Sequence, residues 1–138
     1  MSQAIQNCNN VFGDAFLLDT KTSENLYNQY IKDLPIIDYH NHLEPKLIAS
    51  NEHFNSPTSV WLDGDHYKWR AMRNFGMEEF FISGDASDLE KFKKWSQVVP
   101  YTLRNPLFHW THMEMNKPFG IQQYLTRYYD RRHHSEYQ

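Results

Sequence analysis

His40 and His42 are the first residues whose types and spacing could do chemistry, because they stand one residue apart after an apolar run. In a β-strand, side chains two residues apart point to the same face, so the two imidazoles would project together. Two imidazoles on one face can bind a divalent cation, and zinc is the first expectation. The spacing alone leaves a second interpretation open, in which both histidines end a strand in solvent. A buried strand at Ile36–Tyr39 would favour the metal, since ligand sites in parallel α/β folds lie where strands end.

A second group of reactive residues lies in the stretch "GDHYKWRAMR". On a helix that starts near Asp65, the side chains of His66, Arg70 and Arg73 would share one face. Tyr67 would lie in the first turn, where free backbone N–H groups favour an anion. The group therefore predicts a site for a carboxylate, with a tyrosine hydroxyl that can transfer a proton. The alternative is an ordinary surface helix, in which either arginine is a structural ion-pair partner.

Two more histidines, His109 and His112, stand three residues apart and would share a helical face. Helical bundles also use this spacing for metals. Packing or hydrogen bonding around Trp110 explains the pair without a metal, and we favour that interpretation.

The elements that must position these groups are mostly helical. A first helix is expected from Asp19 or Thr20 to just before Pro35, followed by the short strand. Later helices are expected to begin at four capping signals, namely Ser56-Pro57, Asp65, Ser87–Glu90 and Asn105-Pro106. The last should end before Pro118. The helix that begins at Ser87–Glu90 should bury one apolar face in the core, formed by Leu89, Phe92, Trp95 and Val99. One strand and about five helices cannot complete an α/β sheet, so the pattern predicts the beginning of a larger fold.

Composition narrows the class of protein. The chain has 138 residues, of which 40% are hydrophobic and 16% aromatic, so a folded core is expected. A formal net charge of −3 argues against general binding of nucleic acid. The single cysteine, the lack of a signal peptide and the lack of an apolar run of about 18 residues favour a cytoplasmic protein without a membrane partner.

Five blocks give the sequence a specific resemblance: "FLLDT", "DYHNHL", "WLDGDHYKWRAMR", "GDASDLEKF" and "NPLFHWTHMEM…PFGI". "DYHNHL" resembles the first-strand motif of the amidohydrolase superfamily of metal-dependent TIM barrels. In order and spacing, the five blocks resemble one family within it, the uronate (glucuronate) isomerases, over about residues 16–121.

The resemblance implies an α/β fold, the N-terminal part of a TIM (β/α)₈ barrel whose first strand precedes a large helical insertion. It implies an intramolecular oxidoreductase that interconverts D-glucuronate with D-fructuronate and D-galacturonate with D-tagaturonate. The implied roles are metal binding for His40 and His42, substrate binding for His66, Tyr67 and Arg70, and proton transfer for Tyr67. The partner would be a small-molecule hexuronate, and homo-oligomer formation is left open.

These inferences divide the chain into an N-terminal arm and helix (1–34), the first barrel strand with its His-x-His (35–43), a helical insertion (44–120) and a divergent tail (121–138). A TIM barrel takes about 250 residues, so we expect this chain to be inactive alone. Two alternatives stay open. One is a non-catalytic helical interaction module, and the other is a hydrolytic, metal-dependent amidohydrolase that shares the first-strand motif.

Overall fold

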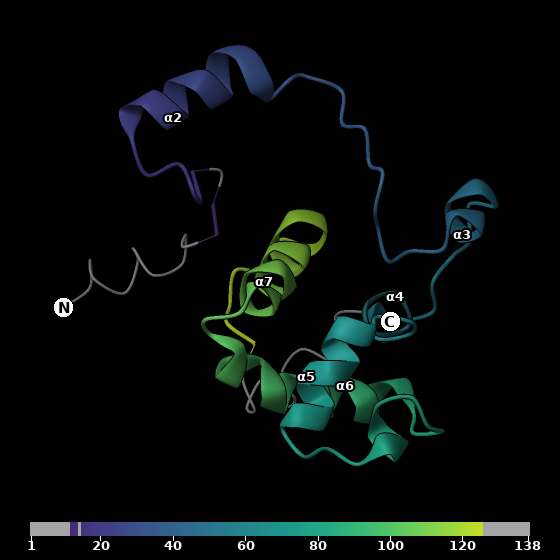
Figure 1. Cartoon of the computed structure of the whole chain (residues 1–138). Coiled ribbons are helices and arrows are strands. Elements are labelled where there is room, and N and C mark those ends of the chain that lie inside the picture. The colour runs from purple at the N-terminus through teal and green to yellow at the C-terminus, as the bar shows by residue number, and fades with distance from the viewer. Residues whose placement is uncertain (1–11, 14, 126–138) are drawn as a thin grey trace. The chain divides into compact units, whose positions relative to one another are not determined.

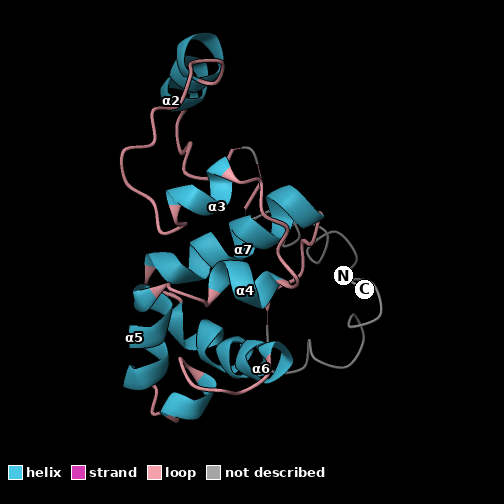
Figure 2. Cartoon of the chain, turned by 90° about the vertical axis from the view of Figure 1, so that its right-hand side faces the viewer, coloured by secondary structure: helices cyan, strands magenta, loops and turns pink. Residues whose placement is uncertain are grey.

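The computed structural model describes residues 12–13 and 15–125 and is helical (Figure 1). No β-strand occurs among these residues, as Figure 2 shows. The chain forms two units: Met1–His40 with His112–Gln123, and Asn41–Thr111 with Tyr124–Gln138. Most of the predicted arm and of the predicted tail lies outside the described residues. Within the described part, no helix is both long and apolar enough to cross a membrane.

In the first unit, α2 (Lys21–Leu26) continues directly into a π-helical turn, η1 (Tyr27–Ile31). Thr20 begins α2 with a capping box, because its hydroxyl accepts from the Ser23 N–H at 3.0 Å and its own N–H donates to the Ser23 hydroxyl at 3.1 Å. The predicted helix before Pro35 is therefore confirmed, although its second half is wound more loosely than an α-helix.

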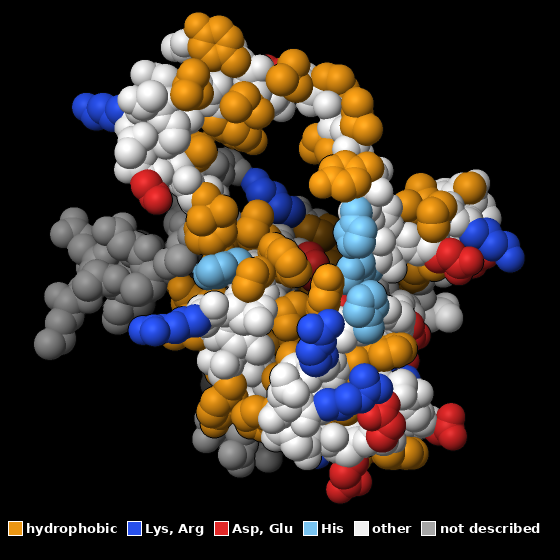
Figure 3. Space-filling model, in the orientation of Figure 1, with side chains coloured by type: hydrophobic (Ala, Val, Ile, Leu, Met, Phe, Trp, Pro, Cys, Tyr) orange, Lys and Arg blue, Asp and Glu red, His pale blue; other side chains and the backbone are white. Residues whose placement is uncertain are grey.

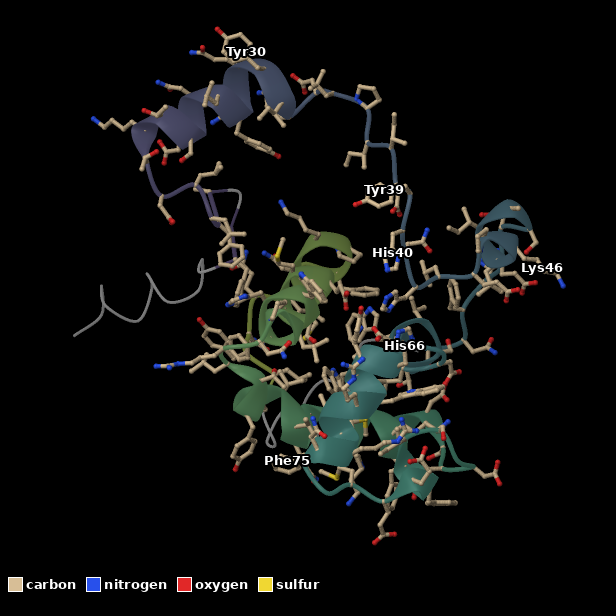
Figure 4. All side chains as sticks on the ribbon, in the orientation of Figure 1. Tyr30, Tyr39, His40, Lys46, His66 and Phe75 are labelled. Atoms are coloured by element: carbon tan, nitrogen blue, oxygen red, sulfur yellow. The ribbon has the colours of Figure 1, made fainter. Side chains whose placement is uncertain are left out.

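The predicted buried strand at Ile36–Tyr39 is wrong for this structure. Residues 35–41 have no regular secondary structure, and Ile36, Ile37 and Tyr39 are 92%, 87% and 95% exposed. Figure 3 shows hydrophobic side chains along this segment, and Figure 4 places Tyr39 and His40 on it. The physical reason is that a strand needs a neighbour to accept and donate its backbone hydrogen bonds, and the described residues provide none.

The second unit contains the remaining short elements: α3 (Pro45–Ala49), α4 (Pro57–Trp61), α5 (His66–Asn74), η2 (Glu79–Phe81), α6 (Asp88–Val98) and η3 (Val99–Thr102). The predicted starts of α4, α5 and α6 are confirmed. Ser56 caps α4 ahead of Pro57, Asp65 caps α5, and Ser87 forms a capping box with Glu90. The capping side chains accept from N–H groups that a helix start leaves without partners.

The core of the second unit forms where α5 and α6 pack together. Met72 of α5 and Trp95 of α6 are fully buried, and so is Val99 just after α6. Trp95 and Val99 confirm the predicted stripe, whereas Leu89 and Phe92 are only partly buried. Burying Met72 fixes one face of α5 against the core, which leaves His66, Tyr67 and Arg70 on the exposed side.

The last helix, α7 (Pro106–Phe119), begins where it was predicted but ends later. Pro118 was expected to lie beyond the helix and instead occupies its final turn. A proline there removes one helical hydrogen bond, and the helix ends one residue later, at Phe119. Gly120, whose φ is +68°, follows it.

Candidate functional site

The candidate site is built around the start of α5, and Asp65 holds that start together. Its Oδ1 accepts from the backbone N–H groups of Tyr67 at 3.0 Å and Lys68 at 3.3 Å. Its Oδ2 accepts from the Lys68 ammonium at 3.0 Å. Because the Asp65 side chain accepts hydrogen bonds from these three donors, the first turn of α5 has a defined conformation.

His42 joins this helix start from 23 positions earlier in the sequence. Its Nδ1 lies 3.4 Å from Asp65 Oδ1, and its ring stacks on the His66 ring with centroids 4.9 Å apart. The Tyr67 ring also lies 4.9 Å from the His42 ring. His42, His66 and Tyr67 therefore form one cluster of groups that can each donate or accept a proton.

Arg70 brings a positive charge to the same cluster. Its guanidinium carbon lies 5.3 Å from the centre of the Tyr67 ring, which is a cation–π contact. Figure 4 shows His66 at the start of α5, and Arg70 follows one turn later on the same helix. An exposed guanidinium over the ring of this tyrosine suits an anionic ligand such as a carboxylate.

The electrostatics of the site depend on Lys68, whose side chain is almost completely buried. Partial burial by itself raises the pKa of the Asp65 carboxyl. The Lys68 ammonium, with hydrogen bonds from Lys68 and from the Tyr67 N–H, outweighs that effect and lowers the pKa of Asp65 below its usual value. Asp65 is therefore a carboxylate at neutral pH, and it can only accept hydrogen bonds.

A groove of about 560 Å³ adjoins the cluster on the second unit. Tyr67 and Arg70 are part of its wall, and aromatic rings from later in the chain complete it, including Phe75, Tyr101 and Trp110. Asn74 and Asn105 add amide groups. The groove thus combines flat apolar surfaces with one cation and several hydrogen-bonding groups, a lining typical of sites for small polar ligands.

The structure brings together most, but not all, of the predicted site. His42, His66, Tyr67 and Arg70 lie together in the second unit. His40 belongs to the first unit, where its N–H donates to Asp38 Oδ1 at 3.2 Å, so the side-by-side arrangement of His40 and His42 stays a prediction. The described residues contain no group of three or more potential metal ligands.

Two details of the predicted site change. The N–H groups of Tyr67 and Lys68, which were expected to be free for an anion at the start of α5, donate to the carboxylate of Asp65 instead. Arg73 does not join the cluster. It forms a bidentate ion pair with Glu79, at 2.8 and 2.5 Å, which confirms the structural interpretation for that arginine.

His112 has a packing role, as favoured from the sequence. It is 3% exposed and its ring stacks on Phe12 with centroids 5.3 Å apart. His109 makes an edge contact with Phe108. Trp110, expected to be the centre of packing, is 49% exposed and lines the groove.

Sequence reasoning assigned Asp65 only the role of a cap and missed Lys68 entirely. The spacing of Asp65 and Lys68, three apart at a helix start, was a usable signal for an ion pair. No comparable signal exists for Tyr101 and Trp110, because they reach the groove from η3 and α7, which lie far beyond α5 in the sequence.

Comparisons with known proteins identify the family. The sequence profile of the glucuronate isomerase family matches residues 8–134. A uronate isomerase of Cellvibrio japonicus is 59% identical over 108 residues, which cover 78% of this chain and 23% of that protein. A uronate isomerase of Shouchella clausii is 58% identical over 111 residues, covering 80% and 24%. The crystal structure of a uronate isomerase from Thermotoga maritima superposes with a TM-score of 0.76 at 36% identity, covering 83% of this chain and 25% of that one.

The chain therefore belongs to the glucuronate isomerase family. It spans about a quarter of the length of the relatives that it matches. The profile also extends past Ile121, to residue 134.

Proposed function

We propose that this chain supplies the His42–His66–Tyr67–Arg70 part of a uronate isomerase site, which interconverts aldose and ketose forms of a hexuronate. The single observation that carries the proposal is the cluster itself. Two imidazoles, a phenol and a guanidinium converge at one helix start, within ring distances of 4.9 Å and a cation–π distance of 5.3 Å.

Each side chain has a task in such a reaction. Arg70 would pair with the carboxylate of the sugar acid, and His66 would hydrogen bond to a hydroxyl of the same molecule. Tyr67 would transfer the proton that leaves C2 and returns at C1. A phenol hydroxyl suits this task, because it can give up a proton and take one back within hydrogen-bonding distance of the substrate.

A divalent metal, zinc first, is part of the proposal, and His40 and His42 are the residues that would hold it. Histidine is a common zinc ligand. The Asp65 carboxylate also faces His42 Nδ1, and a histidine that binds metal through Nε2 usually has such a carboxylate at its other ring nitrogen. His40 and His42 would be two of the four ligands that zinc takes. When bound, the metal would supply a Lewis acid for the substrate oxygens.

A chimera tests the proposal. This chain would replace the matching quarter of the Cellvibrio japonicus relative, and conversion of D-glucuronate to D-fructuronate would be measured for the chimera and for the 138-residue chain alone. The chimera should be active and the chain alone inactive.

Tyr67→Phe in the chimera should lower kcat by about 100-fold or more while changing KM little. Tyr30→Phe removes a hydroxyl from an exposed ring on η1 and is the matched control, for which near-normal turnover is expected. Normal turnover with Tyr67→Phe would remove the tyrosine from the mechanism. A folded chimera without activity would favour the helical interaction module instead.

A further inference from the structure

Asp65 has more contacts than a helix cap requires, and the additional contact reaches His42. A cap needs only the two bonds to the N–H groups of Tyr67 and Lys68. The Oδ1 atom that makes these bonds also lies 3.4 Å from His42 Nδ1. The start of α5 and the histidine 23 positions earlier therefore share one carboxylate oxygen.

The protonation states at this contact follow from the chemistry of the two groups. Both oxygens of Asp65 already accept, Oδ1 from two backbone N–H groups and Oδ2 from the Lys68 ammonium, so the carboxyl group acts as an acceptor. The hydrogen on this contact must come from His42, so Nδ1 carries it. In a neutral imidazole the other nitrogen, Nε2, is then left with its lone pair.

The ring is also held against rotation. His66 stacks on one side of it with planes 23° apart, and the Tyr67 ring lies tilted at the same centroid distance. Asp65 itself is fixed by Lys68, whose ammonium takes its second oxygen. A buried lysine, a carboxylate and a histidine thus form one connected chain of contacts.

We propose that Asp65 is a positioning residue, which fixes His42 in the Nδ1–H tautomer and so presents Nε2 to a divalent cation. The part of this that concerns the cation rests on the proposed function, whereas the tautomer does not. Asp65 would act through His42 and would not touch the substrate. Its role as cap is separable, because serine caps a helix as well as aspartate but is neutral and too short to reach His42.

The experiment uses the 138-residue chain and nitrogen-15 NMR of its histidines at about pH 8.5, where an ordinary imidazole is neutral. In the unaltered chain His42 should show the Nδ1–H pattern. In Asp65→Ser it should change to a mixture or to the Nε2–H pattern. Titration with Zn²⁺ alone, followed at the same signals, should give a Kd at His42 about 10-fold weaker in Asp65→Ser. Ser87→Asp, an exchange of good caps at the start of α6, is the matched control and should leave His42 unchanged.

Several outcomes would overturn the inference. One is an Nε2–H tautomer in the unaltered chain, and another is the same tautomer and the same Zn²⁺ affinity in Asp65→Ser. If the serine variant loses its helical circular dichroism, Asp65→Asn decides by the same two readouts, since asparagine keeps a cap oxygen and loses the charge. An inactive chimera with an Asp65-dependent tautomer would remove the proposed isomerase function and leave this inference standing. An active chimera in which the His42 tautomer does not depend on Asp65 would remove this inference and leave the proposed function standing.

Discussion

Replacing Lys68 with methionine removes the buried cation that Asp65 faces while keeping a side chain of similar length. Lys68 is 5% exposed and its ammonium lies 3.0 Å from Asp65 Oδ2. Losing one partner of a fully buried ion pair costs about 3–5 kcal/mol. The cost should be smaller here, because the Asp65 side chain is 15% exposed and would keep its two backbone N–H donors. The loss of the charged hydrogen bond to Asp65 is the better measure of this contact, so Lys68→Met should lower the free energy of unfolding by about 1.5–3 kcal/mol.

The assay is urea unfolding of the chain at pH 7, followed by tryptophan fluorescence. Lys46→Met removes an exposed lysine of α3 and is the matched control, expected within about 0.5 kcal/mol of the unaltered chain. The loss of unfolding free energy in Lys68→Met should also depend on pH. The Asp65 contribution is complete above its ordinary pKa of 3.8 and disappears as pH falls through its lowered pKa in the folded chain. The penalty for Lys68→Met should therefore shrink in acid. Equal midpoints for Lys68→Met and Lys46→Met at pH 7 would refute the reasoning.

Two further predictions concern the end of α5 and the segment that follows it. Hydrogen bonds from Arg73 and Ser83 lower the pKa of Glu79 to about 2, so the stability that this carboxylate provides is present above its ordinary pKa of 4.5 and lost as pH falls toward 2. Arg73→Gln should return the Glu79 pKa toward 4.5 in an NMR titration of its carboxyl carbon, and a pKa that stays near 2 would contradict this. Gly84→Ala would place a methyl carbon 2.7 Å from the backbone Cα of Phe80, so thermal unfolding should show a loss of about 1–3 kcal/mol. An unchanged Tm would show that the backbone moves aside freely.

Local signals in the sequence predicted the helix starts well. Thr20, Ser56, Asp65 and Ser87 all cap helices as expected, because a cap depends on a side chain and an N–H two or three residues away. The starts of α5 and α6 are correct to the residue. The same local logic placed His66 and Arg70 on one face of α5, but it also placed Arg73 there, and Arg73 pairs with Glu79 instead.

Signals that depend on distant partners failed or were missed. The apolar run Ile36-Ile37 carries the pattern of a buried strand, but a strand forms only when another supplies its hydrogen bonds. Lys68 was not singled out, because nothing in its local sequence indicates that the side chain is buried. Its burial depends on the packing of α5 around Asp65, which no local rule contains.

The sequence by itself determined the family, the starts of the helices and the identity of the reactive side chains, since each of these depends on residue type and on spacing of a few positions. Only the tertiary structure decided that Asp65 faces His42 as well as its own helix, that Arg73 belongs to Glu79, and that Tyr101 and Trp110 share a groove with Tyr67. These facts are set by burial and by contacts between residues far apart in the chain, where solvation and packing compete and the spacing of residues carries no information.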